Sequence, residues 1–153
     1  MEARLKYWKA APEVLQAMSQ LQNVVNQSGL DRGLLDLVTL RVSQINGCAF
    51  CIDMHVKDAR AHGEPQERLD LLVAWRESPF YTDRERAALA WAEAVTLFGE
   101  GHVSDEVYLA SRAHFSEAEL VKLTLALVTI NGWNRLNVAF RTIPGKYQAA
   151  AGS

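Results

Sequence analysis

Apolar residues recur along the chain at the spacing of an α-helix almost everywhere. They stand three or four positions apart, as at Val14, Met18, Leu21 and Val25, which gathers them on one helical face. The starts of these runs are marked by proline or by Ser/Thr-x-x-Glu patterns, and their ends are marked by glycine. The pattern predicts an all-α chain of about seven or eight helices, at residues 3–10, 13–27, 31–46, 48–61, 65–77, 83–98, 104–114 and 117–141.

The last predicted helix, 117–141, is apolar on more than one face. Such a helix runs through the core or lies in an interface between subunits. Gly132 is expected to bend or interrupt it. Its polar residues Asn131, Asn134 and Arg135 need hydrogen-bond partners, which neighbouring helices can supply as well as a substrate can.

A short stretch of the sequence returns 85 positions later, each time before a helical run. The recurring residues are Thr39, Leu40, Ile45, Asn46 and Gly47, then Thr124, Leu125, Ile130, Asn131 and Gly132. The second copy has Trp133 and Leu136 where the first has its two cysteines. The match weakly indicates a duplicated two-helix unit, in which one half does chemistry and the other packs.

Composition and charge narrow the class of protein. The 153 residues, 49% of them apolar, fit one domain over 1–153 that can bury a core without metals or disulfides. A net charge of −2 provides no basic field, so nucleic acid is not an expected partner. The sequence shows neither a secretory signal pattern nor an apolar run long enough for a bilayer, so we expect a cytoplasmic protein with no membrane partner.

The candidate chemistry lies around the two cysteines, Cys48 and Cys51, which the sequence places at the start of a helix predicted after Gly47. A helix N-terminus favours a thiolate, and two thiols one turn apart can close into a disulfide. His55 follows Cys51 by four residues and would lie on the same helical face as a base. Asp36, on the preceding helix, could bring a carboxylate towards this histidine.

This pattern resembles a known family. Ser-x-x-Asn-x-Cys-x-x-Cys-x-x-x-His at residues 43–55, preceded by an Asp-Leu-Val-Thr-Leu-Arg run, is similar to the core of AhpD-like alkylhydroperoxidases in the carboxymuconolactone decarboxylase superfamily. The resemblance covers residues 30–62 and extends more loosely to 131–135. It implies an AhpD-like helical domain, assembled as a homo-trimer or homo-hexamer, that reduces organic hydroperoxides as an antioxidant oxidoreductase without a bound cofactor.

The resemblance also implies roles for the candidate residues. Cys51 would attack the peroxide and become a sulfenic acid, Cys48 would resolve it to a disulfide, and His55 with Asp36 would relay the proton. A dithiol protein, either a lipoyl-bearing adaptor or a thioredoxin-like protein, would then reduce the disulfide. The helix terminus alone favours Cys48 as the thiolate, but a neighbouring imidazole lowers a thiol pKa more strongly than the helix dipole does.

Two departures from the family weaken the expected relay. Asp36 stands where the family has a glutamate, which is one methylene longer, and a water would then have to bridge the gap. Phe50 stands where some members carry a second histidine. Both changes bear on peroxidase efficiency more than on the dithiol chemistry.

Other interpretations remain open. Cys48, Cys51 and His55 could ligate zinc, although no fourth ligand is evident, or the cysteines could be inert core residues. Asp36 could be an ordinary ion-pair residue. The fold could also serve a lyase or isomerase resembling carboxymuconolactone decarboxylase, or a noncatalytic module that senses oxidants. No role is predicted for the three histidines near glycines or helix ends, which are His62, His102 and His114.

Overall fold

The computed structural model describes residues 1–99 and 101–150. Within these ranges it has eight α-helices, one short 3-10 helix and no strand, which confirms the all-α prediction. None of these helices is both long and apolar enough to cross a bilayer. The elements are α1 (Tyr7–Ala10), α2 (Pro12–Asn26), α3 (Arg32–Ile45), α4 (Ala49–Ala61), α5 (Gln66–Asp70), η1 (Leu72–Ala74), α6 (Asp83–Thr96), α7 (Asp105–Arg112) and α8 (Glu117–Phe140).

The local capping patterns explain where several helices begin. Thr82 and Ser116 each form a full capping box with the glutamate three residues later, as their sequence patterns predict. The structure corrects the predicted helix 65–77, which is instead the short α5 followed by η1. The chain turns there because Leu72 and Trp75 are both buried in the core.

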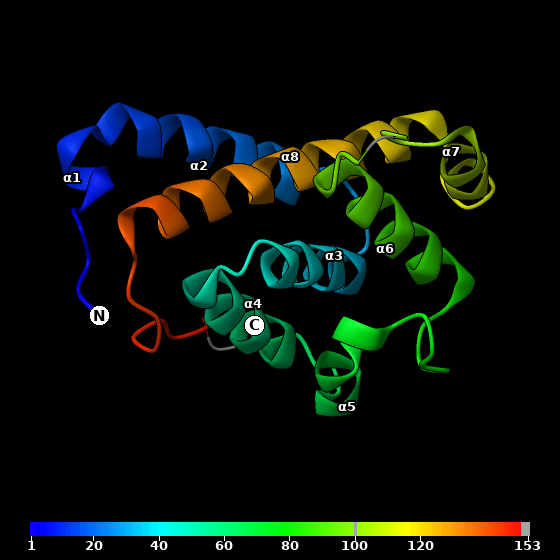
Figure 1. The fold of residues 1–153 in the computed structure, drawn as a ribbon, viewed down its shortest axis with the longest axis horizontal. Coiled ribbons are helices and arrows are strands. Elements are labelled where there is room, and N and C mark those ends of the chain that lie inside the picture. The colour runs from blue at the N-terminus through cyan, green and yellow to red at the C-terminus, as the bar shows by residue number, and fades with distance from the viewer. Residues whose placement is uncertain (100, 151–153) are drawn as a thin grey trace.

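Helix α8 runs without a break through Gly132, so the expected interruption there is wrong. A Cβ atom at this glycine would lie 3.0 Å from the Cε atom of Met18 on α2. The missing side chain therefore lets α2 and α8 pack closely side by side, as Figure 1 shows.

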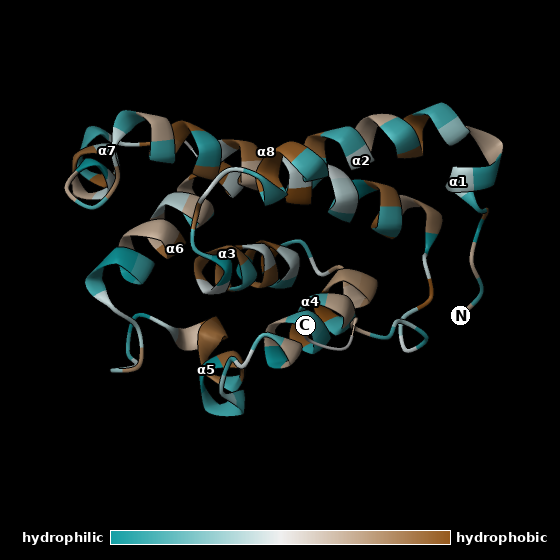
Figure 2. Ribbon diagram, turned by 180° about the vertical axis from the view of Figure 1, so that it is seen from behind, coloured by the Kyte–Doolittle hydropathy of each residue, from teal (hydrophilic) through white to brown (hydrophobic). Residues whose placement is uncertain are grey.

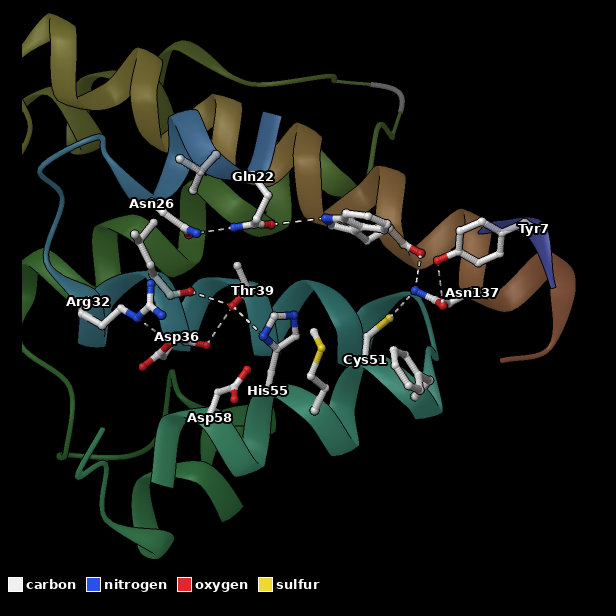
Figure 3. Close-up of a pocket in the computed structure, with 15 residues that line it drawn as sticks. Tyr7, Gln22, Asn26, Arg32, Asp36, Thr39, Cys51, His55, Asp58 and Asn137 are labelled. Atoms are coloured by element: carbon white, nitrogen blue, oxygen red, sulfur yellow. Dashed lines mark hydrogen bonds and ion pairs between the residues drawn. The ribbon is translucent and has the colours of Figure 1, made fainter. Parts of the chain in front are cut away.

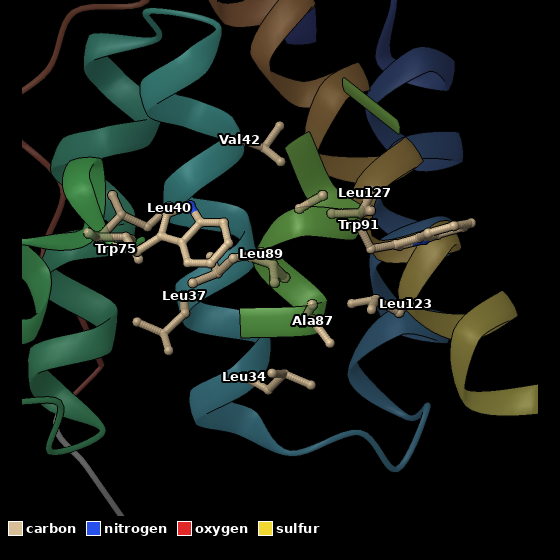
Figure 4. Close-up of a cluster of buried hydrophobic side chains, with 14 of the residues drawn as sticks. Leu34, Leu37, Leu40, Val42, Trp75, Ala87, Leu89, Trp91, Leu123 and Leu127 are labelled. Carbon is tan, nitrogen blue, oxygen red and sulfur yellow. The ribbon is translucent and has the colours of Figure 1, made fainter. Parts of the chain in front are cut away.

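Helix α3 lies at the centre of the fold and packs against α4, α6 and α8 (Figure 1). Hydrophobic residues are prominent along α3 and α8 in Figure 2. The core in Figure 4 joins side chains of α3, α6 and α8, with Trp75 of the segment before α6 at one side. Its labelled members are Leu34, Leu37, Leu40, Val42, Trp75, Ala87, Leu89, Trp91, Leu123 and Leu127.

Polar side chains join the C-terminal end of α3 to the middle of α8. The Asn46 amide donates to Oδ1 of Asn131 at 3.0 Å and to Oδ1 of Asn134 at 2.9 Å. Asn134 in turn donates to the Ser43 hydroxyl at 3.1 Å. The asparagines of α8 thus find interhelical partners, and the two residues at equivalent positions of the short repeat, Asn46 and Asn131, contact each other. This network fixes the end of α3 just before the turn that leads to the cysteines.

Candidate redox site

The cysteines lie where the chain turns from α3 into α4. Gly47 has a φ of +63°, a left-handed conformation that suits glycine, and it reverses the chain direction. Cys48 is the N-cap of α4, and its Sγ atom accepts a hydrogen bond from the backbone N–H of Cys51 at 3.3 Å. The two sulfur atoms form a disulfide, with Cα atoms 5.3 Å apart, and each residue is only 1% exposed.

A cavity of about 340 Å³ lies beside the second cysteine (Figure 3). Cys51 lines this cavity, whereas Cys48 is not among the described residues that do so. The walls near Cys51 include the apolar or aromatic side chains of Phe50, Met54 and Trp133. Of the two sulfur atoms, that of Cys51 is therefore the one next to space that can hold a ligand.

A buried amide holds the Cys51 sulfur from the opposite helix. Asn137 of α8 donates through Nδ2 to Cys51 Sγ at 3.7 Å and to the carbonyl of Trp133 at 2.9 Å. Its Oδ1 accepts from the hydroxyl of Tyr7 on α1 at 3.4 Å. A fixed N–H donor aimed at this sulfur would stabilise its thiolate form. Nothing in the sequence pattern singled out Asn137, apart from its being polar in an apolar helix.

His55 lies one helical turn after Cys51 and lines the same cavity. Its Nδ1 atom is 3.5 Å from the hydroxyl oxygen of Thr39 on α3. That hydroxyl donates its proton to the Leu35 carbonyl at 2.8 Å, so its oxygen can only accept from the imidazole. We therefore assign the proton of the neutral ring to Nδ1, which leaves the lone pair on Nε2.

The Nε2 atom of His55 is buried and has no hydrogen-bond partner among the described residues. Burial lowers the pKa of His55 to about 4, although the negative charge of Asp58 opposes this effect and the positive charge of Arg32 adds to it. The imidazole is therefore neutral near pH 7 and presents an unprotonated nitrogen. In the described structure the imidazole makes no hydrogen bond to either sulfur. His55 and Cys51 instead line the same cavity.

Asp36 also lines the cavity, but its carboxylate is engaged elsewhere. Its Oδ2 atom is 2.6 Å from Nδ1 of His62, and its Oδ1 atom is 3.8 Å from Nε of Arg32. Burial raises the pKa of Asp36, against the opposing effects of His62 and Arg32. No hydrogen bond joins Asp36 to His55 in the part of the chain that is described.

The sequence pattern left His62 without a role, and the structure makes it the partner of Asp36. His62 lies two helical turns after His55, so both face α3 from the same side of α4. The spacing of seven residues was the signal that could have found it. The other two histidines, His102 and His114, are not among the residues that line the cavity.

A second carboxylate, that of Asp58, faces the cavity from α4. Its Oδ1 atom accepts a hydrogen bond from the hydroxyl of Tyr147 at 2.6 Å. Tyr147 belongs to the segment after α8, which returns alongside α4 (Figure 1). The contact spans 89 residues of sequence, so no local pattern could indicate it.

The zinc interpretation finds no support in the side-chain arrangement. Within the described ranges, no group of three histidine, cysteine or acidic residues is placed to hold a metal ion. The two cysteines are joined to each other in a disulfide, which leaves neither sulfur as a thiolate ligand.

Comparisons with known proteins agree with this geometry. The model of the carboxymuconolactone decarboxylase family matches residues 12–94. The uncharacterized protein YdfG of Bacillus subtilis is 43% identical over 139 residues, which are 91% of this chain and 95% of that protein. An alkyl hydroperoxide reductase AhpD of Hyphomonas neptunium is 35% identical over 51 residues, covering 33% of this chain and 28% of its own.

Among solved structures, a protein of unknown function from Agrobacterium tumefaciens is similar over 95% of this chain and 100% of its own. It is 46% identical, with a TM-score of 0.92, and is described as a candidate antioxidant defence protein AhpD. The likeness over the full helical arrangement supports the AhpD-like fold expected from the cysteine motif.

Proposed function

The chain belongs to the carboxymuconolactone decarboxylase family, and from this premise we propose that it is a thiol-dependent peroxidase that reduces organic hydroperoxides. One observation carries the proposal. The sulfur of Cys51 lines a cavity together with the unpartnered nitrogen of a neutral imidazole, His55, while Cys48 lies at bonding distance behind it. A nucleophile, a base and a resolving thiol are thereby available around one space.

The proposed cycle begins with both thiols reduced. His55 Nε2 accepts the Cys51 thiol proton, and the thiolate attacks the terminal oxygen of the hydroperoxide. An S–O bond forms, the O–O bond breaks, and the alcohol leaves with the proton returned by the imidazole. Cys48 then attacks the Cys51 sulfenic acid, which forms the disulfide and releases water. Two thiols thus supply the two electrons that reduce the peroxide.

The Asn137 amide and the N-terminus of α4 have supporting roles in this proposal. Both place N–H dipoles near the cysteine pair, and each favours a negatively charged sulfur. The amide acts on Cys51, whereas the backbone N–H of Cys51 itself points at Cys48. The relay role expected of Asp36 stays a prediction, because its carboxylate is bound to His62.

The size and lining of the cavity support an organic substrate. About 340 Å³ is within the usual range of small-molecule sites and far exceeds the space that hydrogen peroxide needs. Phe50, Met54 and Trp133 offer apolar contact near the reacting sulfur. Such walls gain from burying an alkyl or aryl group and gain nothing from hydrogen peroxide.

The burial of the disulfide bears on its reductant. Both cysteines are 1% exposed, so a partner must deliver a thiolate into the cavity rather than against the surface. A lipoyl group on a slender arm can do this more readily than a cysteine held on a thioredoxin-like surface. We therefore favour the lipoyl-bearing adaptor of the two expected reductants.

An exposed apolar surface supports association of the chain with further copies of itself, of which a homo-trimer or homo-hexamer is the expected form. Large apolar side chains are exposed on the faces of α7 and α8 that point away from the core, among them Leu109, Val121 and Val128. A groove beside them is lined largely by apolar atoms and includes Trp91 and Leu120. Burying such a surface against further copies of the chain would remove it from water.

The proposal is tested by counting thiols. Reduced wild-type protein treated with one equivalent of cumene hydroperoxide should lose both thiols, whereas Cys48→Ser should hold a sulfenic acid on Cys51 that dimedone labels and mass spectrometry locates. Cys51→Ser is the matched control and should remain unlabelled. Thiols that stay unchanged in the wild type would exclude the peroxidase.

The same experiment addresses the alternatives. A lyase or isomerase needs no redox pair, so oxidation of its two thiols would not accompany catalytic reduction of the hydroperoxide. A noncatalytic sensor would be oxidised once and would not turn over when a lipoyl dithiol is supplied in excess.

A further inference from the structure

We propose that Asp58, held in place by Tyr147, is the carboxylate that assists His55 in proton transfer. This inference rests on the proposed peroxidase function. It assigns a positioning pair that the cysteine motif does not contain, and it gives the acid role to a residue other than Asp36.

The first support is position on α4. Asp58 follows His55 by three residues, so the two side chains leave the same face of the helix about one turn apart. Both line the cavity that Cys51 lines. Figure 3 shows the Asp58 carboxylate between the side chains of His55 and Asp36.

The second support is that Asp36, the other candidate for this role, already has partners for its carboxylate. Asp36 is bound at 2.6 Å to His62 and lies 3.8 Å from Arg32, so each of its oxygens faces another partner. The charges of Asp58 and Arg32 both affect the pKa of the His55 imidazole. The charge of Asp58 favours the protonated imidazole, and that of Arg32 disfavours it.

The third support is the segment that holds Asp58. The backbone N–H of Gly145 donates to Asp53 at 3.0 Å, and Lys57 donates to the Tyr147 carbonyl at 3.1 Å. The Tyr147 hydroxyl then reaches Asp58 at 2.6 Å. Burial and this hydrogen bond raise the pKa of Tyr147 to about 12, so the phenol stays protonated and donates. The segment after α8 therefore fixes the carboxylate at a defined place beside the imidazole.

The chemical consequence concerns the step in which His55 takes the thiol proton. That step creates a positive imidazolium in a buried place, which burial alone makes costly. A negative charge held one helical turn away lowers this cost, in the way that the aspartate of a serine protease stabilises its imidazolium. In the described residues Asp58 makes no hydrogen bond to the Cys51 sulfur, so we assign its action to the charge it places near His55.

The test compares Asp58→Asn, Asp36→Asn and Tyr147→Phe, each combined with Cys48→Ser. Stopped-flow mixing of the reduced proteins with cumene hydroperoxide measures the rate of Cys51 sulfenic acid formation. Asp58→Asn should slow this step by about tenfold, the factor that corresponds to one pKa unit. Tyr147→Phe should slow it less, and in the same direction. Asp70→Asn, at an exposed carboxylate on α5, is the matched control.

A second readout separates an electrostatic role from a structural one. Nitrogen NMR of labelled His55 should show a lower imidazole pKa in Asp58→Asn than in its parent, because the stabilising charge is lost. If Asp36→Asn lowers that pKa and slows the reaction while Asp58→Asn does neither, the assignment to Asp58 is overturned. Should Asp58→Asn fail to fold, Tyr147→Phe still decides the question, and an unchanged rate with an unchanged pKa would refute it.

The outcome distinguishes this inference from the proposed function. If even the Cys48→Ser parent does not react with the hydroperoxide, the peroxidase proposal fails. The NMR titration of His55 needs no substrate, so it still decides whether Asp58 acts on the imidazole.

Discussion

Replacing His55 with glutamine should make folding less sensitive to acid. The imidazole has an ordinary pKa of 6.5 in the unfolded chain and about 4 in the folded protein, because burial disfavours its charged form. Below pH 6.5 the unfolded chain therefore binds a proton that the folded protein does not. The stability associated with neutral His55 is complete above pH 6.5, falls as the pH drops towards 4, and changes no further below that value.

The size of the effect follows from these two values. At pH 5 the wild type should lose about 2 kcal/mol of unfolding free energy through this residue, and near the acid limit about 3 kcal/mol. His55→Gln has no titrating group at this position and should not show this loss. The difference in stability between the two proteins should therefore shift by about 2 kcal/mol in favour of the variant between about pH 7.5 and pH 5.

Urea denaturation followed by circular dichroism at these two pH values measures the shift. His114→Gln, which replaces an exposed histidine, controls for the loss of a histidine in general. The glutamine can change the unfolding free energy equally at both pH values. The informative quantity is therefore how the difference in unfolding free energy between variant and wild type changes with pH. A difference that stays constant from about pH 7.5 to pH 5 would show that His55 is not buried in its neutral form.

Three further substitutions test other parts of the structure. Asn46→Ala should destabilise the fold by roughly 1–3 kcal/mol in urea denaturation, because the buried amide oxygen of Asn134 loses its donor and that of Asn131 keeps only Arg135; no loss would mean that water replaces the Asn46 amide. Gly47→Ala should cost about 1 kcal/mol through backbone strain alone, since its φ is +63° and nothing lies within 4 Å of the added Cβ; a cost several times larger would point to a clash instead. In a Cys48→Ser background, Asn137→Leu should raise the Cys51 thiol pKa by roughly one unit, seen as a shifted pH profile of alkylation; an unshifted profile would exclude this amide as a thiolate donor.

Much of the helical framework could be predicted from residue spacing. The capping boxes at Thr82 and Ser116 begin helices as expected, because a cap is satisfied within three residues of itself. The failures were at 65–77 and at Gly132. In each case the backbone follows a contact with a distant segment, since Trp75 turns into the core and Gly132 meets Met18 of α2.

Residue spacing is enough to predict which groups stand together on α4. Cys48, Cys51 and His55 share the first turns of one helix because helical geometry fixes the positions of residues three and four apart. Their redox interpretation needed no knowledge of the rest of the molecule. The same local rule also placed Asp58 on that helix and His62 just after its end, although it could not say which partners they would meet.

The partners of these side chains depend on how the helices pack. Asp36 pairs with His62, Asp58 with Tyr147, and Asn137 reaches the Cys51 sulfur. Each contact joins different elements of the fold, and a carboxylate or amide binds whichever complementary group the packing of α3, α8 and the final segment brings within hydrogen-bonding distance. That choice depends on how whole helices cross, which is set by the apolar core and not by the spacing of polar residues along the chain.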